Sequence, residues 1–211
     1  MAEIEYFYSA HSAFAYLGSA RFLEIAQAAG RRIHHRPMDL DQLMVRIGAV
    51  PMAERGPVRR GYFFGREIER WSEERNAPVT ATLPAGHRKD QTLPNAVLIA
   101  ALQAGRNVDA LAHAMLQAHW RDDVDLTEPG NLEPLIRGAG LDPAALLAAA
   151  GTDAVLAKYR ANTDEAVERG VFGAPTYFVD GDMFYGQDRL EQVEKALRKP
   201  YRKGFYGGGG R

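Results

Sequence analysis

Cysteine is absent from the 211 residues of this chain. Its absence excludes disulfides, thiolate metal sites, cysteine nucleophiles and Cys-x-x-Cys redox chemistry carried by the chain itself. A surplus of charge is absent too, because 26 Lys and Arg residues stand against 27 Asp and Glu residues and leave a formal net charge of -1. Binding to phosphate backbones needs excess positive charge, so we expect no nucleic-acid partner.

Long uninterrupted hydrophobic runs are also missing. Charged residues break the Ala- and Leu-rich stretches within about 20 positions, which is too short for a membrane-spanning helix. The opening residues include Glu3 and Glu5 and have no basic segment ahead of an apolar core, so they do not resemble a signal peptide. We therefore expect a cytoplasmic protein with no membrane partner.

The composition is otherwise that of a globular protein, with 46% hydrophobic and 25% charged residues. Strand-like segments lie near the two ends of the chain, and the middle has the helical period throughout. The predicted strands cover residues 4–8, 32–36, 176–179 and 183–185. The predicted helices cover residues 13–28, 59–75, 93–104, 108–120, 128–138, 143–150, 152–169 and, capped by Asp188, 189–198.

This order of elements is β-α-β, then helices, then β-β-α, which is the order of a thioredoxin fold. We therefore predict an α/β, thioredoxin-like domain formed by residues 1–40 and 170–200. Residues 41–169 form a large all-α insertion domain in this interpretation, and residues 201–211 a flexible, glycine-rich tail.

The reactive position of a thioredoxin-like fold is the N-terminus of the first helix, where backbone N–H groups and the helix dipole stabilise an anion. Ser12 stands there, at the position where a redox protein would carry its attacking cysteine. Ala15, three residues later, offers no resolving group. An ordinary helix N-cap is the alternative interpretation of Ser12, because serine is favoured at that position.

A second signal is the proline that opens the third predicted strand. Proline after a small residue at such a place is commonly cis, so we predict a cis peptide bond between Ala174 and Pro175. The residue before a cis proline can pair its backbone with an extended ligand. A plain proline at the start of a strand is the alternative.

Three motifs together resemble the 2-hydroxychromene-2-carboxylate isomerases, a family allied to kappa-class glutathione transferases and the DsbA-like thioredoxin superfamily. They are Ser12-Ala13-Phe14-Ala15-Tyr16-Leu17, Gly170-Val171-Phe172-Gly173-Ala174-Pro175-Thr176 and Gly186-Gln187-Asp188-Arg189-Leu190. The likeness spans nearly the whole chain. Two departures stand out, because the family commonly has Ser-Pro-x-Ser-Tyr-Leu in the first motif and Gly-Asn-Asp-Arg-Leu in the last.

The resemblance implies a glutathione-dependent cis–trans isomerase that acts on 2-hydroxychromene-2-carboxylate or a similar intermediate of aromatic-compound catabolism. The glutathione thiolate would add reversibly to the small-molecule aromatic substrate. Ser12 would hold the sulfur, the Ala174 backbone beside Pro175 the cysteinyl part, and Gln187 and Asp188 the γ-glutamyl end. The family likeness also implies a homodimer. The alternatives are a kappa-type transferase and a glutathione-binding protein without turnover.

Further candidates for substrate contacts are His11, Arg59 and Tyr62. His11 adjoins Ser12 and could touch substrate or move a proton, or it could be a solvated loop histidine.

No histidine pattern indicates a metal site, so we predict none. His34 and His35 are neighbours on a predicted strand and point to opposite faces. His113 and His119 are six positions apart on a helix, and His87 has no histidine near it in the sequence.

Overall fold

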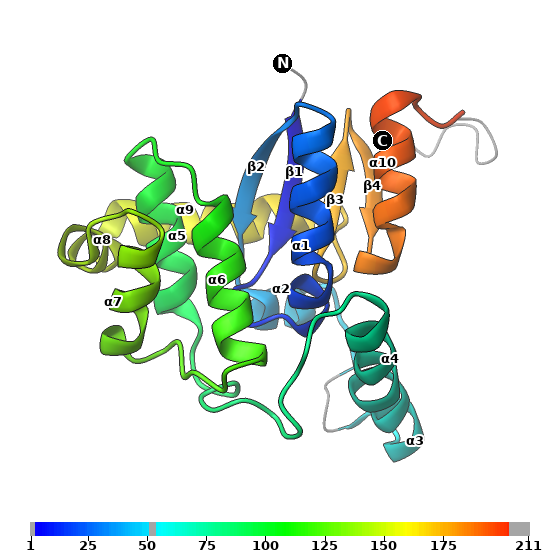
Figure 1. Cartoon of the computed structure of the whole chain (residues 1–211), viewed down its shortest axis with the longest axis horizontal. Coiled ribbons are helices and arrows are strands. Elements are labelled where there is room, and N and C mark those ends of the chain that lie inside the picture. The colour runs from blue at the N-terminus through cyan, green and yellow to red at the C-terminus, as the bar shows by residue number, and fades with distance from the viewer. Residues whose placement is uncertain (1–2, 51–53, 203–211) are drawn as a thin grey trace.

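The computed structural model describes residues 3–50 and 54–202 of the chain. Four strands form one mixed sheet in the order β2-β1-β3-β4 (Figure 1). The strands are β1 (Glu3–Tyr8), β2 (Arg32–Pro37), β3 (Thr176–Val179) and β4 (Asp182–Tyr185). β1 runs parallel to β2 and antiparallel to β3, so segments from the two ends of the chain share a sheet, as predicted.

Successive side chains of β1 point to opposite faces of the sheet and pack against helices on both sides. Tyr6 points to one face, where its ring lies 4.8 Å from Phe22 of helix α1 (Ala13–Ala28). Phe7 points to the other face and packs with Ala166 of helix α9 (Asp153–Glu168). Figure 1 shows α1 and α10 (Leu190–Arg198) together on one side of the sheet and α9 passing behind it. This α/β/α arrangement places the N-terminus of α1 at the carboxyl end of β1.

The described part of the chain between residues 41 and 169 contains helices and no strand, as the helical period predicted. The elements from β2 to α9 are α2 (Leu40–Arg46), α3 (Pro57–Gly61), a π-helical turn (Tyr62–Arg66), α4 (Glu67–Glu74), α5 (Thr92–Gln103), α6 (Asp109–Trp120), α7 (Pro129–Gly138) and α8 (Pro143–Ala150). None of the helices within the described residues is both long and apolar enough to span a membrane.

Three local predictions need correction. α2 was not predicted, because its seven residues, about two turns, bury only Leu43 and so leave almost no periodic signal. The single helix predicted over residues 59–75 is α3 and α4 joined by the π-helical turn. Asp188 does not cap the last helix: it lies inside a 3-10 turn (Gln187–Arg189), and α10 begins at Leu190. The predicted glycine-rich tail lies outside the described residues apart from residues 201 and 202.

Candidate active site

Ser12 is the N-cap of α1, as the sequence predicted. Its extended backbone places the side-chain oxygen Oγ to accept a hydrogen bond from the Ala15 N–H at 3.3 Å. The hydroxyl also donates to the carbonyl oxygen of Ala174 over 3.5 Å, which is long for an O–H···O bond. Ser12 is 6% exposed, so a ligand that reaches this hydroxyl meets it with little competing water.

The loop before β3 faces Ser12. The Ala174–Pro175 peptide bond is cis, as predicted. Thr176 closes the loop by donating its hydroxyl to the Gly173 carbonyl at 2.8 Å. Gly173 packs against the ring of Tyr185, and a side chain at this glycine would come within 2.5 Å of that ring. The loop is therefore held closely in place, with the Ala174 carbonyl presented to α1.

The 3-10 turn is joined directly to this loop, because the Gly186 N–H donates to the Pro175 carbonyl at 2.9 Å. Gly186 has a φ of 99°, a conformation that favours glycine. The exposed Asp188 carboxylate folds back over it and lies 3.4 Å from the Arg189 guanidinium. Ser12, Ala174 and Asp188, predicted to act together, thus lie along one continuous chain of contacts.

Gln187, predicted with Asp188 to hold the γ-glutamyl end, is engaged within the protein. It is 1% exposed, and its amide oxygen accepts a hydrogen bond from Arg75 Nε at 3.0 Å. Arg75 also donates to the Gln187 carbonyl at 3.2 Å and pairs with Glu191 at 2.7 Å. Sequence reasoning missed Arg75, because nothing in its local sequence indicates a partner more than a hundred positions away.

Arg59 and Tyr62 lie on the exposed segment formed by α3 and the π-helical turn. The Arg59 guanidinium stacks on Phe63 at 6.0 Å, and Tyr62 is 48% exposed beside Arg70. This segment reaches α1 through Phe64, whose ring centroid is 6.4 Å from that of Phe14. The structure therefore places the two predicted substrate contacts on a flanking surface, apart from the contacts that join Ser12, Ala174 and Asp188.

His11 is buried rather than solvated, with 7% of its surface exposed. Its Nδ1 lies 2.8 Å from Ser9 Oγ, and the same Oγ accepts a hydrogen bond from the Asn95 amide at 3.0 Å. The Asn95 oxygen accepts the Ala10 N–H, which fixes the orientation of that amide. The free hydrogen of Ser9 then points to His11 Nδ1, so we assign the proton of the neutral imidazole to Nε2.

Two further histidines pack beside His11: His87 meets its ring edge to face, and His119 stacks on His87. The His11 ring centroid lies 5.1 Å from that of His87, and His87 Nδ1 lies 2.9 Å from His119 Nε2. Burial is the main cause that lowers the pKa of His11 to about 3 and that of His87 to about 4, and it also lowers the pKa of His119. The three rings are therefore neutral near pH 7. Within the described residues, no group of three or more His, Cys, Asp or Glu side chains is arranged to hold a metal ion.

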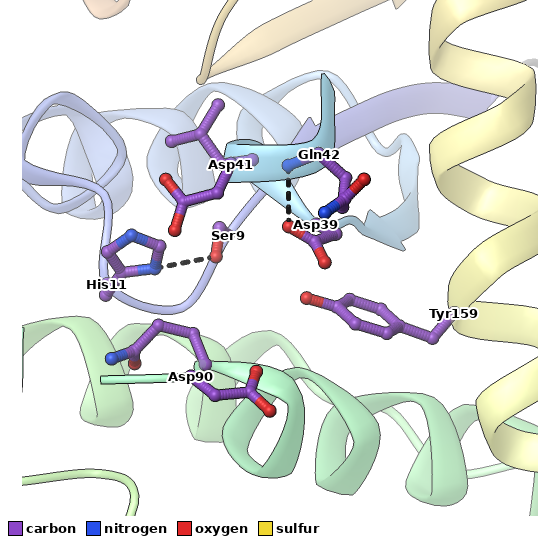
Figure 2. Close-up of a pocket in the computed structure, with 9 residues that line it drawn as sticks. Ser9, His11, Asp39, Asp41, Gln42, Asp90 and Tyr159 are labelled. Atoms are coloured by element: carbon purple, nitrogen blue, oxygen red, sulfur yellow. Dashed lines mark hydrogen bonds between the residues drawn. The ribbon is translucent and has the colours of Figure 1, made fainter. Parts of the chain in front are cut away.

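A cavity of about 210 Å3 opens beside His11 (Figure 2). It lies between the β1–α1 loop and the starts of α2 and α5, and a side chain of α9 closes it. The lining residues are Ser9, His11, Asp39, Leu40, Asp41, Gln42, Asp90, Gln91 and Tyr159. Sequence reasoning missed this set, apart from His11, because its members come from four separate segments.

Comparison with known proteins supports the fold and the resemblance. The family model of the DSBA-like thioredoxin domain matches residues 3–198. A 2-hydroxychromene-2-carboxylate isomerase of Sphingobium xenophagum is 29% identical over 196 residues, which are 92% of this chain and 97% of that protein. Another of the same name, from Pseudomonas sp. (strain C18), is 27% identical over 92% of this chain and 89% of its own length.

Solved structures share the architecture. A 2-hydroxychromene-2-carboxylate isomerase superposes with a TM-score of 0.75 at 24% identity, covering 93% of this chain and 94% of that one. A probable DsbA oxidoreductase from Streptomyces coelicolor gives a TM-score of 0.71 at 20% identity over 95% and 90% of the two chains. Because the family model matches almost the whole length of this chain, the chain belongs to the DSBA-like thioredoxin family.

Proposed function

We propose that this protein is a glutathione-dependent cis–trans isomerase, acting on 2-hydroxychromene-2-carboxylate or a similar intermediate of aromatic catabolism. The observation that carries the proposal is the contact between Ser12 and Ala174 at the start of α1 in a chain without cysteine. A thioredoxin-like site with no thiol of its own is suited to a thiol brought by a ligand. The relatives named as isomerases supply the reaction type.

The residues present fit glutathione. The Ser12 hydroxyl hydrogen is engaged by a long bond of 3.5 Å, so it can turn to a sulfur anion without losing a strong partner. The first N–H groups of α1 add positive potential at the same point. The exposed Asp188 carboxylate meets Arg189 only at 3.4 Å, so it retains capacity to accept hydrogen bonds from the ammonium group of a γ-glutamyl end. Gln187 is engaged by Arg75, so we assign it to shaping the turn that presents Asp188.

When bound, glutathione supplies the thiol that adds reversibly to a conjugated double bond and so permits rotation about it. Ser12 holds the sulfur as thiolate by donating its hydroxyl hydrogen. Ala174 orients the bound peptide through its backbone beside Pro175. The low exposure of Ser12 and Ala174 limits water at the point of reaction.

Indirect support for the cofactor comes from a structural relative. The cytosolic disulfide reductase DsbM of Pseudomonas aeruginosa has been solved with GSH, and it superposes on this chain with a TM-score of 0.64 at 18% identity. We propose a cytoplasmic homodimer, as the family likeness implies. Sedimentation of a monomer at micromolar concentration would contradict the dimer.

The direct test incubates the purified protein with glutathione and racemic 2-hydroxychromene-2-carboxylate and follows isomerisation by absorbance. Glutathione-dependent turnover without a change in product mass supports the isomerase. A product that keeps the sulfur would identify a kappa-type transferase instead. Calorimetric binding of glutathione without turnover of any conjugated substrate would identify a binding protein.

A further inference from the structure

The cavity beside His11 carries one sign of charge. Asp39, Asp41 and Asp90 contribute carboxylates to its lining, and within the described residues no Lys or Arg lines it. Burial and the nearby Asp39 and Asp90 raise the pKa of Asp41. The imidazole of His11 is neutral, so it does not offset this charge. An anion that entered the cavity would therefore meet repulsion, and a cation would relieve it.

Two of these carboxylates retain capacity for a ligand. Asp39 caps α2 through one oxygen, Oδ1, which accepts the Gln42 N–H at 2.9 Å. Asp90 uses one oxygen in the same way for the backbone and hydroxyl of Thr92. Each leaves its second oxygen uncommitted within the described residues. Asp41 makes no ion pair there.

A buried acceptor without a partner also lines the cavity. Gln91 is 6% exposed, and its amide nitrogen donates to the carbonyls of Gly86 and Lys89. Its buried oxygen Oε1 accepts no hydrogen bond within the described residues, so it is available to a donor that enters the cavity. Figure 2 shows the hydroxyl of Tyr159 reaching from α9 toward Asp39 and Asp90, and Asn95 hydrogen-bonds that hydroxyl. The unpartnered Gln91 oxygen is a second observation, independent of the carboxylates.

We propose that this cavity binds an ammonium or similar cationic end group of the molecule that reacts beside Ser12. The N–H hydrogens of an ammonium group match the acceptors that line the cavity, namely the carboxylates of Asp41 and Asp90 and the Oε1 of Gln91. Ser9 and His11 line the cavity and belong to the short loop that leads into Ser12, so the cavity and the candidate reactive hydroxyl share one loop.

This inference rests on the proposed function and narrows its substrate class. The named relatives take a carboxylate compound, whereas a carboxylate placed in this cavity would face three aspartates. The preferred substrate of this chain is therefore a conjugated molecule with a cationic end, within the class of similar intermediates. The departures from the family motif at Ala13 and Ala15 lie on the same side of the fold, at the start of α1.

Glutathione derivatives with different end groups test the inference. S-(ω-aminoalkyl), S-(ω-hydroxyalkyl) and S-(ω-carboxyalkyl) glutathiones of matched and increasing length would be titrated by calorimetry. At the length that reaches the cavity, we expect the amine to bind about tenfold more tightly than the alcohol, and the carboxylate most weakly. The preference for the amine should shrink as salt is added.

Paired variants locate the effect. The double variant Asp41→Asn with Asp90→Asn removes the two carboxylates assigned to the ammonium group, so it should bind the three derivatives almost equally. Both residues are exposed, so the substitutions leave the core intact. Glu133→Gln on α7, an exposed carboxylate outside the cavity, should keep the wild-type ranking.

The possible results separate the two proposals. If glutathione itself does not bind, the proposed function is overturned and this inference falls with it. If glutathione binds but the amine shows no preference at any length, or the carboxylate binds best, the inference alone is overturned. A ranking that survives in the double variant would also overturn it, because the charge of these aspartates would not be its source.

Discussion

The Ser12 hydroxyl oxygen lies 3.5 Å from the carbonyl oxygen of Ala174, a residue 162 positions later in the chain. Ordinary O–H···O bonds are about 2.7–2.8 Å long, so this hydrogen is weakly held. The same oxygen accepts the Ala15 N–H and so caps α1. The oxygen of Ser12 caps the helix, and its weakly held hydrogen is available to a ligand. The two roles can be separated by experiment.

Ser12→Ala should weaken turnover far more than it weakens folding. Loss of a helix cap typically costs about 1 kcal/mol in the free energy of unfolding. Loss of one hydrogen-bond donor to an anion in a preorganised site can lower turnover about 10²–10³-fold. The measurements are urea unfolding, isomerase kcat and the thiolate absorbance of bound glutathione against pH.

Asp142→Ala is the matched control for this variant. Asp142 caps α8 by accepting the N–H groups of Ala144 and Ala145, away from the candidate site. It should cost similar stability and leave turnover unchanged. If Ser12→Ala behaves like Asp142→Ala, with the same thiol pKa and the same turnover as the wild type, Ser12 is only a helix cap.

Asp188→Asn should raise the KM for glutathione and leave kcat nearly unchanged. The carboxylate would meet the γ-glutamyl ammonium in the ground state and the transition state alike, so its loss removes uniform binding. We expect a loss of affinity of about two- to fivefold, since the group is exposed. Glu168→Gln, an exposed carboxylate at the end of α9, is the control and should change neither constant. An unchanged KM would remove Asp188 from the site.

Arg75→Ala should disturb the proposed glutathione site through Gln187. The Arg75 guanidinium donates hydrogen bonds to the side chain and to the backbone carbonyl of Gln187, and the Arg75 side chain is 11% exposed. Its loss leaves those buried acceptors without a donor, so we expect a destabilisation of about 1–3 kcal/mol. Glutathione affinity should fall as well, because Gln187 and Asp188 share one turn.

Arg70→Ala, on the same helix, is the comparison for Arg75→Ala. Arg70 pairs with Glu67 on the surface, and such pairs contribute at most about 1 kcal/mol. Urea unfolding and glutathione calorimetry on the two variants test whether Arg75 organises the turn that contains Gln187 and Asp188. Equal effects would show that Arg75 does not organise the turn.

Stability should fall as the pH drops from about 6.5 to about 4.5. Buried His11 and His87 have folded-state pKa values of about 3 and about 4, below the value of about 6.5 expected in the unfolded chain. In this window the unfolded chain takes up protons that the folded chain does not, so folding weakens with acid. Each such histidine contributes up to about 1.4 kcal/mol per pH unit.

The contribution of these histidines to the pH dependence of stability falls in a different pH window from that of the carboxylates. Glu5 and Asp125 have lowered pKa values in the folded chain, so their contributions are present above the unfolded values and are lost below about pH 4.5. Urea unfolding at a series of pH values is the measurement. The variant His87→Gln should flatten the slope between pH 6.5 and 4.5, and an unchanged slope would show that His87 is protonated in the folded protein.

The fold was largely predictable from local pattern. The helical period of residues 13–28, the β-prone ends and the order of elements are properties of neighbouring residues, and they led to the thioredoxin-like sheet. Ser12 and the cis bond at Pro175 were predictable for the same reason, since a cap and a turn proline have local signatures.

The surroundings of the site were not predictable in this way. Arg75 meets Gln187 across 112 positions, and Asn95 meets Ser9 across 86. The cluster of His11, His87 and His119 likewise joins three segments. Such contacts depend on how helices pack against the sheet, which the hydrophobic period of each helix does not specify.

The two hydrogen bonds that join Asn95 to the loop before α1 have a consequence for any attempt to shorten this protein. Asn95 belongs to α5, in the helical middle of the chain, and yet its amide satisfies both the Ser9 hydroxyl and the Ala10 N–H at the start of the candidate site. Excising the helices to leave a minimal thioredoxin domain would strand these polar groups without partners and release the loop that carries Ser12. The helical middle of the chain is thus part of the support of the candidate site, and a shortened protein should lose the order of this loop together with the helices.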